Sequence, residues 1–105
     1  MRKFKINHGC GNMILTGTYF NPKTESYDDL YIHVSDEDIA ARIANLGKAV
    51  SAVMQALNST CEVEVSEDTL FISTVLSYRE LKELMEMRVY GHLFEEQYTI
   101  TKGAA

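Results

Sequence analysis

The sequence predicts a single α+β domain over residues 1–105. Its mainly antiparallel sheet carries one long and one shorter helix on one face. Three observations support this prediction. Short segments that alternate polar and apolar residues, as half-buried strands do, fill the first third of the chain and recur later. One long segment has helical periodicity, and a shorter helical segment follows two further strand-like segments. The expected order of elements is β-β-β-α-β-β-α-β.

Three strand-like segments precede the long helix, namely residues 3–7, 13–20 and 29–34. The first alternates cleanly, and the second is rich in β-branched and aromatic residues. Turns are expected at 8–12 and 21–26, where glycine, asparagine and proline gather. Gly17 is expected at a bulge or a close contact. In the third segment, Leu30 and Ile32 share one side. These segments predict a three-stranded antiparallel meander.

The long helix is expected over residues 35–58, with Ser35 as its N-cap and Asp38 in a capping-box position. Negative charge in its first turn complements the helix dipole. The apolar residues follow one another at steps of four and three, so they form one stripe. That stripe consists of Ile39, Ile43, Leu46, Val50, Val53 and Leu57. The helix is therefore expected to cover the core.

A row of small residues runs beside this stripe, made of Ala40, Ala44, Gly47 and Ser51. Glycine in mid-helix costs roughly 1 kcal/mol relative to alanine. We therefore expect Gly47 to mark a close approach to a sheet or another helix, although a tolerated glycine without a role fits equally well. A helix of this length is also expected to outrun short strands. We predict that the row lies in an interface with another protein.

Two further strands are expected at 61–65 and 70–73. Ser77 and Glu80 then form a capping box that opens the second helix. Its inner face is expected to contain Tyr78, Leu81, Leu84, Met85 and Val89. Gly91 suits the helix terminus, although residues 88–93 also alternate and allow a strand instead. A last strand is expected at 97–101.

Composition narrows the function classes. The net charge of −5 disfavours binding to nucleic acid or to an anionic membrane surface. No apolar run approaches the ~18 residues that a membrane span needs. The N-terminal residues lack the apolar region of a secretory signal. A cytoplasmic location is therefore expected, with Cys10 and Cys61 in the reduced state.

The loop His8-Gly9-Cys10-Gly11-Asn12 is the candidate ligand-binding site. Its glycines allow main-chain N–H groups to converge on an anion, and a thiol beside an imidazole is nucleophilic when its pKa is lowered. A lone Gly-x-Gly is weak evidence, and a hairpin loop with an incidental cysteine explains the same residues. If the functional interpretation holds, Cys10→Ser abolishes the activity.

No metal site and no cofactor are predicted. The available ligands lack the spacing of a zinc pattern, since the chain has neither Cys-x-x-Cys nor two histidines four apart on a helix. These ligands are His8, Cys10, His33, Cys61 and His92. The chain also contains no Gly-x-Ser-x-Gly, P-loop or dinucleotide-binding fingerprint, so no catalytic residue is assigned.

Two functional hypotheses follow. The first is a small non-catalytic domain that acts through protein–protein contact, as a homodimer or with another protein. It rests on the long helix, its small-residue row and the missing catalytic constellation. The second is a small enzyme or ligand-binding domain that uses the loop at 8–12. Light scattering tests the first hypothesis. A pocket that brings Cys10 within hydrogen-bond reach of a histidine would favour the second.

Overall fold

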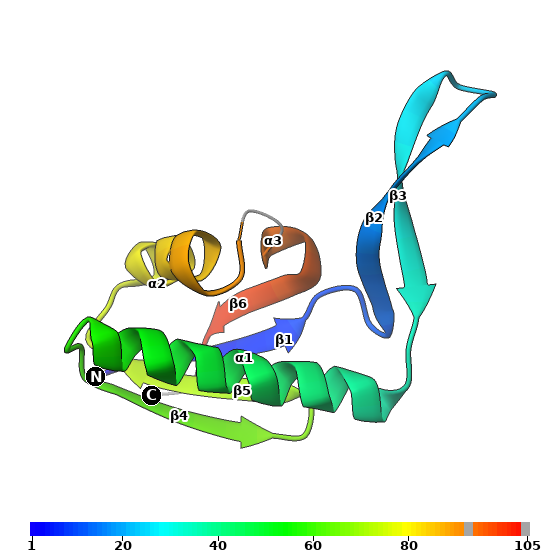
Figure 1. Ribbon diagram of the computed structural model, residues 1–105. Coiled ribbons are helices and arrows are strands. Elements are labelled where there is room, and N and C mark those ends of the chain that lie inside the picture. Colours follow the sequence, from blue (N-terminus) through cyan, green and yellow to red (C-terminus); the bar gives the residue numbers. More distant parts are fainter. Residues whose placement is uncertain (92–93, 104–105) are drawn as a thin grey trace.

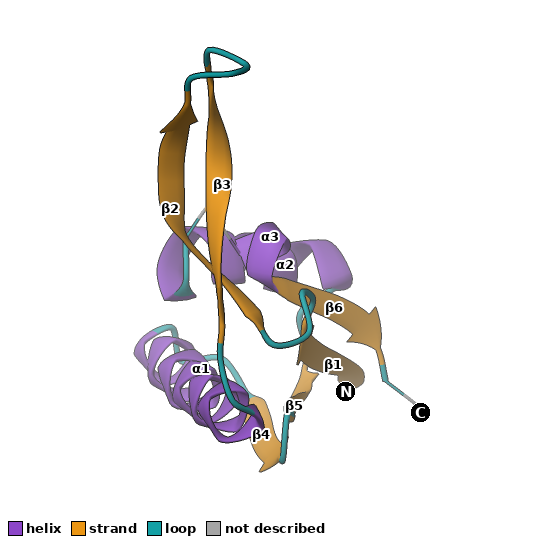
Figure 2. Cartoon of the chain, turned by 90° about the vertical axis from the view of Figure 1, so that its right-hand side faces the viewer, coloured by secondary structure: helices purple, strands orange, loops and turns teal. Residues whose placement is uncertain are grey.

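The computed structural model describes residues 1–91 and 94–103 and has the predicted α+β class. A four-stranded sheet carries helices on one face, and a separate two-stranded hairpin projects away from it (Figures 1 and 2). In chain order, the elements are β1 (Arg2–His8), β2 (Met13–Asn21), β3 (Ser26–His33), α1 (Asp36–Ala56), β4 (Cys61–Ser66), β5 (Thr69–Thr74), α2 (Tyr78–Leu84), the π-helix η1 (Met85–Val89), α3 (Phe94–Gln97) and β6 (Tyr98–Lys102).

The main sheet has the strand order β4-β5-β1-β6, and all its pairs are antiparallel. β1 is therefore an inner strand, with Ile6 opposite Leu70 of β5 on one side and Ile100 of β6 on the other. Alternate residues of β1, Phe4 and Ile6, are buried under the helices. This one-sided burial follows directly from the period of two that the sequence displays.

The predicted three-stranded meander is wrong. β1 does not pair with β2, because its two edges are already taken by β5 and β6. β2 and β3 pair with each other instead, from Met13 opposite His33 to Asn21 opposite Ser26. Of the two alternatives expected at Gly17, a bulge or a close contact, the structure shows the bulge: the register shifts between Leu15 and Gly17, and Gly17 has a φ of +155°.

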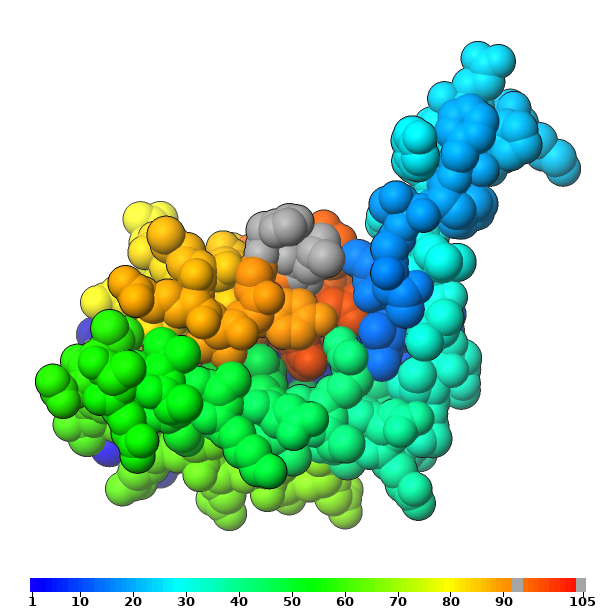
Figure 3. Space-filling model, viewed as in Figure 1, coloured from blue at the N-terminus to red at the C-terminus, as the bar shows by residue number. Residues whose placement is uncertain are grey.

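We call β2, β3 and the turn between them the arm (residues 13–33). It stands clear of the rest of the molecule in the space-filling view (Figure 3). Leu30 and Ile32 are 44% and 47% exposed, although a strand of a one-sided sheet would bury one such row. Ile14 is the one fully buried residue of the arm.

The long helix is confirmed with its cap. The hydroxyl of Ser35 accepts a hydrogen bond from the N–H of Asp38 at 3.1 Å. The predicted stripe is buried as far as Val50, but then the buried position passes to Met54, while Leu57 is 45% exposed. The steps of four and three average 3.5 residues, whereas a straight helix turns every 3.6, so the stripe drifts off the core.

The second helix is confirmed in part. Its capping box is present, since the Ser77 N–H donates to the Glu80 carboxylate at 3.0 Å and the Glu80 N–H donates to the Ser77 hydroxyl at 3.2 Å. The helix then widens into η1 rather than continuing as an α-helix. The alternative of a strand over 88–93 fails for Arg88 and Val89, which are helical; residues 92–93 lie outside the described residues. The short α3 was not predicted.

Ser77→Ala is expected to lower the free energy of unfolding by about 1 kcal/mol, because it removes the side-chain half of the capping box. Hydrogen bonds from Ser77, the main-chain one first, hold the pKa of Glu80 below its usual value. The Glu80 carboxylate thus contributes to the free energy of unfolding above its unfolded-state pKa. This contribution is lost as the pH falls through the lower folded-state pKa. Urea titrations at several pH values measure both effects, with the exposed Ser66→Ala as the neutral control.

Candidate functional site

The loop between β1 and β2 directs its hydrogen bonds to the surrounding main chain. The His8 Nδ1–H donates to the carbonyl of Gly11 at 2.7 Å, and the Cys10 thiol donates to the carbonyl of Glu96 at 2.9 Å. Gly11 has a φ of +60°, the conformation for which the sequence predicted a glycine. Gly9 lies against the junction of α3 and β6. Its N–H donates to the carbonyl of Gln97 at 2.7 Å, and a Cβ on it would lie 2.9 Å from the hydroxyl of Thr99.

Asn12 completes this set of contacts by fixing the start of α1. The side-chain amide of Asn12 donates to the main-chain carbonyl of Val34 at 3.0 Å and to the carboxylate of Asp36 at 2.8 Å. The main-chain carbonyl of Asn12 accepts from the Val34 N–H at 2.8 Å. The loop therefore holds the base of the arm against α1 and α3, which gives its residues a structural role.

The chemistry available to Cys10 is set by these partners. Its thiol faces a carbonyl acceptor, and no hydrogen bond joins it to His8 among the described residues. A nucleophile–base pair needs that link or a short path to it. The geometry therefore brings the five predicted loop residues together without forming the pair that the enzyme hypothesis requires.

A groove of about 500 Å³ opens beside the loop. Its polar lining is largely acidic, from the start of α1 and the turn between β4 and β5: Asp36, Glu37, Glu67 and Asp68, with His8 and Asn12 beside them. Within residues 1–91 and 94–103, no three His, Cys, Asp or Glu side chains gather as a metal site would require. His92, one of the ligands considered above, lies outside the described residues.

The small-residue row of α1 faces the protein's own sheet at one point. A Cβ on Gly47 would lie 3.0 Å from Leu70, 3.2 Å from Val65 and 3.3 Å from Val63, so glycine lets α1 pack closely on β4 and β5. The predicted close approach is thus to a sheet of the same chain. Ala40, Ala44 and Ser51 are half-buried.

The arm was missed as a candidate site. Its apolar residues are unusually exposed for their type: Met13, Tyr19, Phe20, Tyr27, Leu30, Tyr31 and Ile32. The sequence held one signal for this, because β2 has neighbouring apolar residues at 14–15 and again at 19–20. A strand that is apolar on both faces normally lies between two covering layers, and the described chain supplies neither layer along most of the arm.

None of the described helices combines the length and apolarity needed to cross a bilayer. Comparison with protein-family models, curated proteins and solved structures finds no match to this chain.

Proposed function

We propose that this chain is a small, non-catalytic cytosolic domain that acts through protein–protein contact, and that it forms a homodimer through the arm. The observation that carries the proposal is the exposed, two-sided apolar surface of the arm. A two-stranded hairpin of this kind is marginally stable by itself in water. Pairing with a second molecule supplies part of the missing cover and adds strands to the hairpin.

Both faces of the arm carry apolar pairs. On one face, Phe20 lies opposite Tyr27 with their rings in an edge-to-face contact at 5.4 Å, and Leu15 lies opposite Tyr31. On the other face, the residues that follow the same alternation are Ile14, Tyr19, Leu30 and Ile32. Aromatic residues are enriched at protein interfaces, where they bury a large area at a low entropic cost.

The extra surface has the size of an interface. The chain exposes 6786 Å², whereas a compact monomer of this length exposes ~6,000 Å². The excess of ~800 Å² is close to the area that each partner buries in a standard interface. The radius of gyration is 15.2 Å, against ~13 Å for a compact domain of this length.

The strand composition of the arm favours β2 as the contact edge. β2 is nine residues long and has no charged side chain, whereas β3 carries Asp28 and Asp29. Charged side chains are a common protection of edge strands against pairing. We therefore infer that β2 pairs antiparallel with β2 of a second copy about a two-fold axis near Gly17. The resulting four-stranded sheet covers the β2 edge of each arm and brings side chains of the two β2 strands into cross-strand contact on both faces.

Light scattering after size exclusion tests this proposal. The full chain is expected to have a dimeric mass at micromolar concentration. Thr18→Lys should weaken the dimer at least about tenfold, because the two-fold axis beside it brings the two new charges close together on one face of the sheet. Thr24→Lys, the same change in the turn of the arm, should leave the dimer intact.

Circular dichroism of each variant separates loss of association from loss of folding. A monomeric wild-type chain contradicts the homodimer, even if the chain captures a different protein. Equal weakening by both lysine variants contradicts the β2 contact. A dimer that survives Thr18→Lys but dissociates in Ser51→Lys would move the contact to the small-residue row of α1.

A further inference from the structure

A second cavity lies on a different part of the molecule, between α1 and the end of η1, with β6 beneath it. Its volume is about 300 Å³, which is the lower end of the range for small-molecule sites. The lining residues include Arg42, Asn45, Ala49, Val89, Tyr90 and Tyr98. The seam between α1 (green) and η1 (orange) faces the viewer in Figure 3. This cavity shares no residue with the loop or the arm.

Arg42 brings a positive charge into the cavity, and the described lining residues carry no negative charge to match it. Its Nη2–H donates to the hydroxyl of Tyr90 at 3.1 Å. Its Nε–H is buried and has no acceptor among the described residues, and no carboxylate appears in the described lining. A guanidinium that is partly removed from water, with an N–H unused, is costly unless an anion accepts from it.

Two phenol groups complement this charge. The Tyr90 hydroxyl accepts from Arg42, so its own proton is available to a further acceptor. The rings of Tyr90 and Tyr98 meet edge to face with their centroids 5.1 Å apart. Burial raises the pKa of Tyr98, and the Arg42 guanidinium offsets only part of that effect, so the hydroxyl stays protonated at neutral pH. Both phenols can therefore donate.

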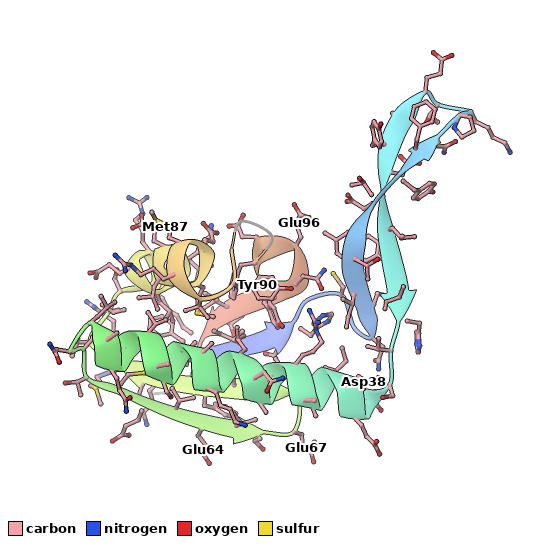
Figure 4. All side chains as sticks on the ribbon, viewed as in Figure 1. Asp38, Glu64, Glu67, Met87, Tyr90 and Glu96 are labelled. Carbon is pink, nitrogen blue, oxygen red and sulfur yellow. The ribbon has the colours of Figure 1, made fainter. Side chains whose placement is uncertain are left out.

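The π-helix is the local device that presents Tyr90. The N–H of Tyr90 donates to the carbonyl of Met85 at 2.8 Å, five residues back, and Gly91 follows with a φ of +121°. The widened turn sends the Tyr90 ring from the end of η1 toward α1 (Figure 4). Single π-turns of this kind are rare in proteins, and those that occur frequently lie at functional sites.

From these contacts we propose that the Arg42 cavity binds a small organic carboxylate with an apolar body. The carboxylate accepts from the Nη N–H groups of Arg42 that the bond to Tyr90 leaves unused and from the phenol of Tyr90, while the body lies against Ala49 and Val89. One guanidinium matches one negative charge. A phosphate dianion would need more positive charge than this cavity offers in a chain of net charge −5.

Nuclear magnetic resonance of the full chain tests the proposal with benzoate as the probe. Benzoate is expected to shift the Arg42 Nε–H signal and the Tyr90 amide signal in a saturable way. Benzamide, which has the same shape without the charge, should not. Inorganic phosphate is the third probe. A response to phosphate without one to benzoate, or equal responses to benzoate and benzamide, overturns the proposal.

Substitutions locate the binding. Arg42→Gln should weaken benzoate binding about tenfold or more, because it removes the charge-assisted hydrogen bond. Lys48→Gln removes the same charge from an exposed position of the same helix and should leave binding unchanged. Tyr90→Phe keeps the guanidinium and should weaken binding about three- to tenfold. Equal affinity in Arg42→Gln and wild type, or equal weakening by Arg42→Gln and Lys48→Gln, overturns the assignment.

Discussion

Leu46→Ala is expected to lower the free energy of unfolding by ~2–5 kcal/mol. Leu46 is 5% exposed and belongs to the core cluster between α1 and the sheet, together with Ile43 and Val50. Truncation removes apolar contact and leaves a cavity, because the surrounding side chains relax only in part. Urea denaturation followed by circular dichroism measures the loss. Wild type and variant are compared at one protein concentration, since dimerisation would contribute to stability.

Leu57→Ala is the matched control for this prediction. It is the same substitution in the same predicted stripe, but Leu57 is 45% exposed and caps the end of α1. Its loss should stay below about 1 kcal/mol. If Leu46→Ala costs less than about 1 kcal/mol, or if the two variants lose equally, the buried face of α1 is not the one that contains Leu46.

The contrast between these leucines shows how far the sequence determines the fold. Elements that depend on local signals were predicted well: the Ser35 cap, the Ser77–Glu80 capping box and the bulge at Gly17 all come from residues within a few positions of one another. The exact end of the buried stripe was not predicted well, because it depends on how α1 crosses the sheet and on where η1 lies.

Strand pairing was the main failure, for a physical reason. β1 pairs with strands that follow it by more than sixty residues, and nothing in its own composition distinguishes those partners from β2. Hairpin pairing is the better expectation for neighbouring strands. In this fold β1 instead pairs with β5 and β6 as an inner strand, and β2 and β3 pair with each other as the arm.

The candidate sites show the same limit. The sequence correctly indicated a turn at 8–12, but the partner of the Cys10 thiol is a carbonyl of residue 96. Arg42 falls on the polar side of the predicted helix and has no local feature that singles it out. Its contact with Tyr90 arises from the π-turn, which has no sequence pattern to predict it.

Gln97→Met is expected to raise the free energy of unfolding by ~1–3 kcal/mol. Gln97 is 1% exposed, and both its amide oxygen and its amide nitrogen are buried without a hydrogen-bond partner among the described residues. Burying an unpaired amide costs that order of free energy, whereas methionine has nearly the same length and no strong polar group. Its main-chain bond to Gly9 is unaffected by the substitution.

Gln55→Met makes the same chemical change at an exposed position of α1 and controls for a general effect of methionine. Its stability should stay within about 0.5 kcal/mol of wild type. A gain in Gln97→Met alone attributes the cost to the buried amide. A loss above about 1 kcal/mol would instead mean that an ordered water or another group satisfies the amide, because removing a bonded buried partner destabilises. The direction of the change therefore distinguishes an unpaired core amide from a bonded one.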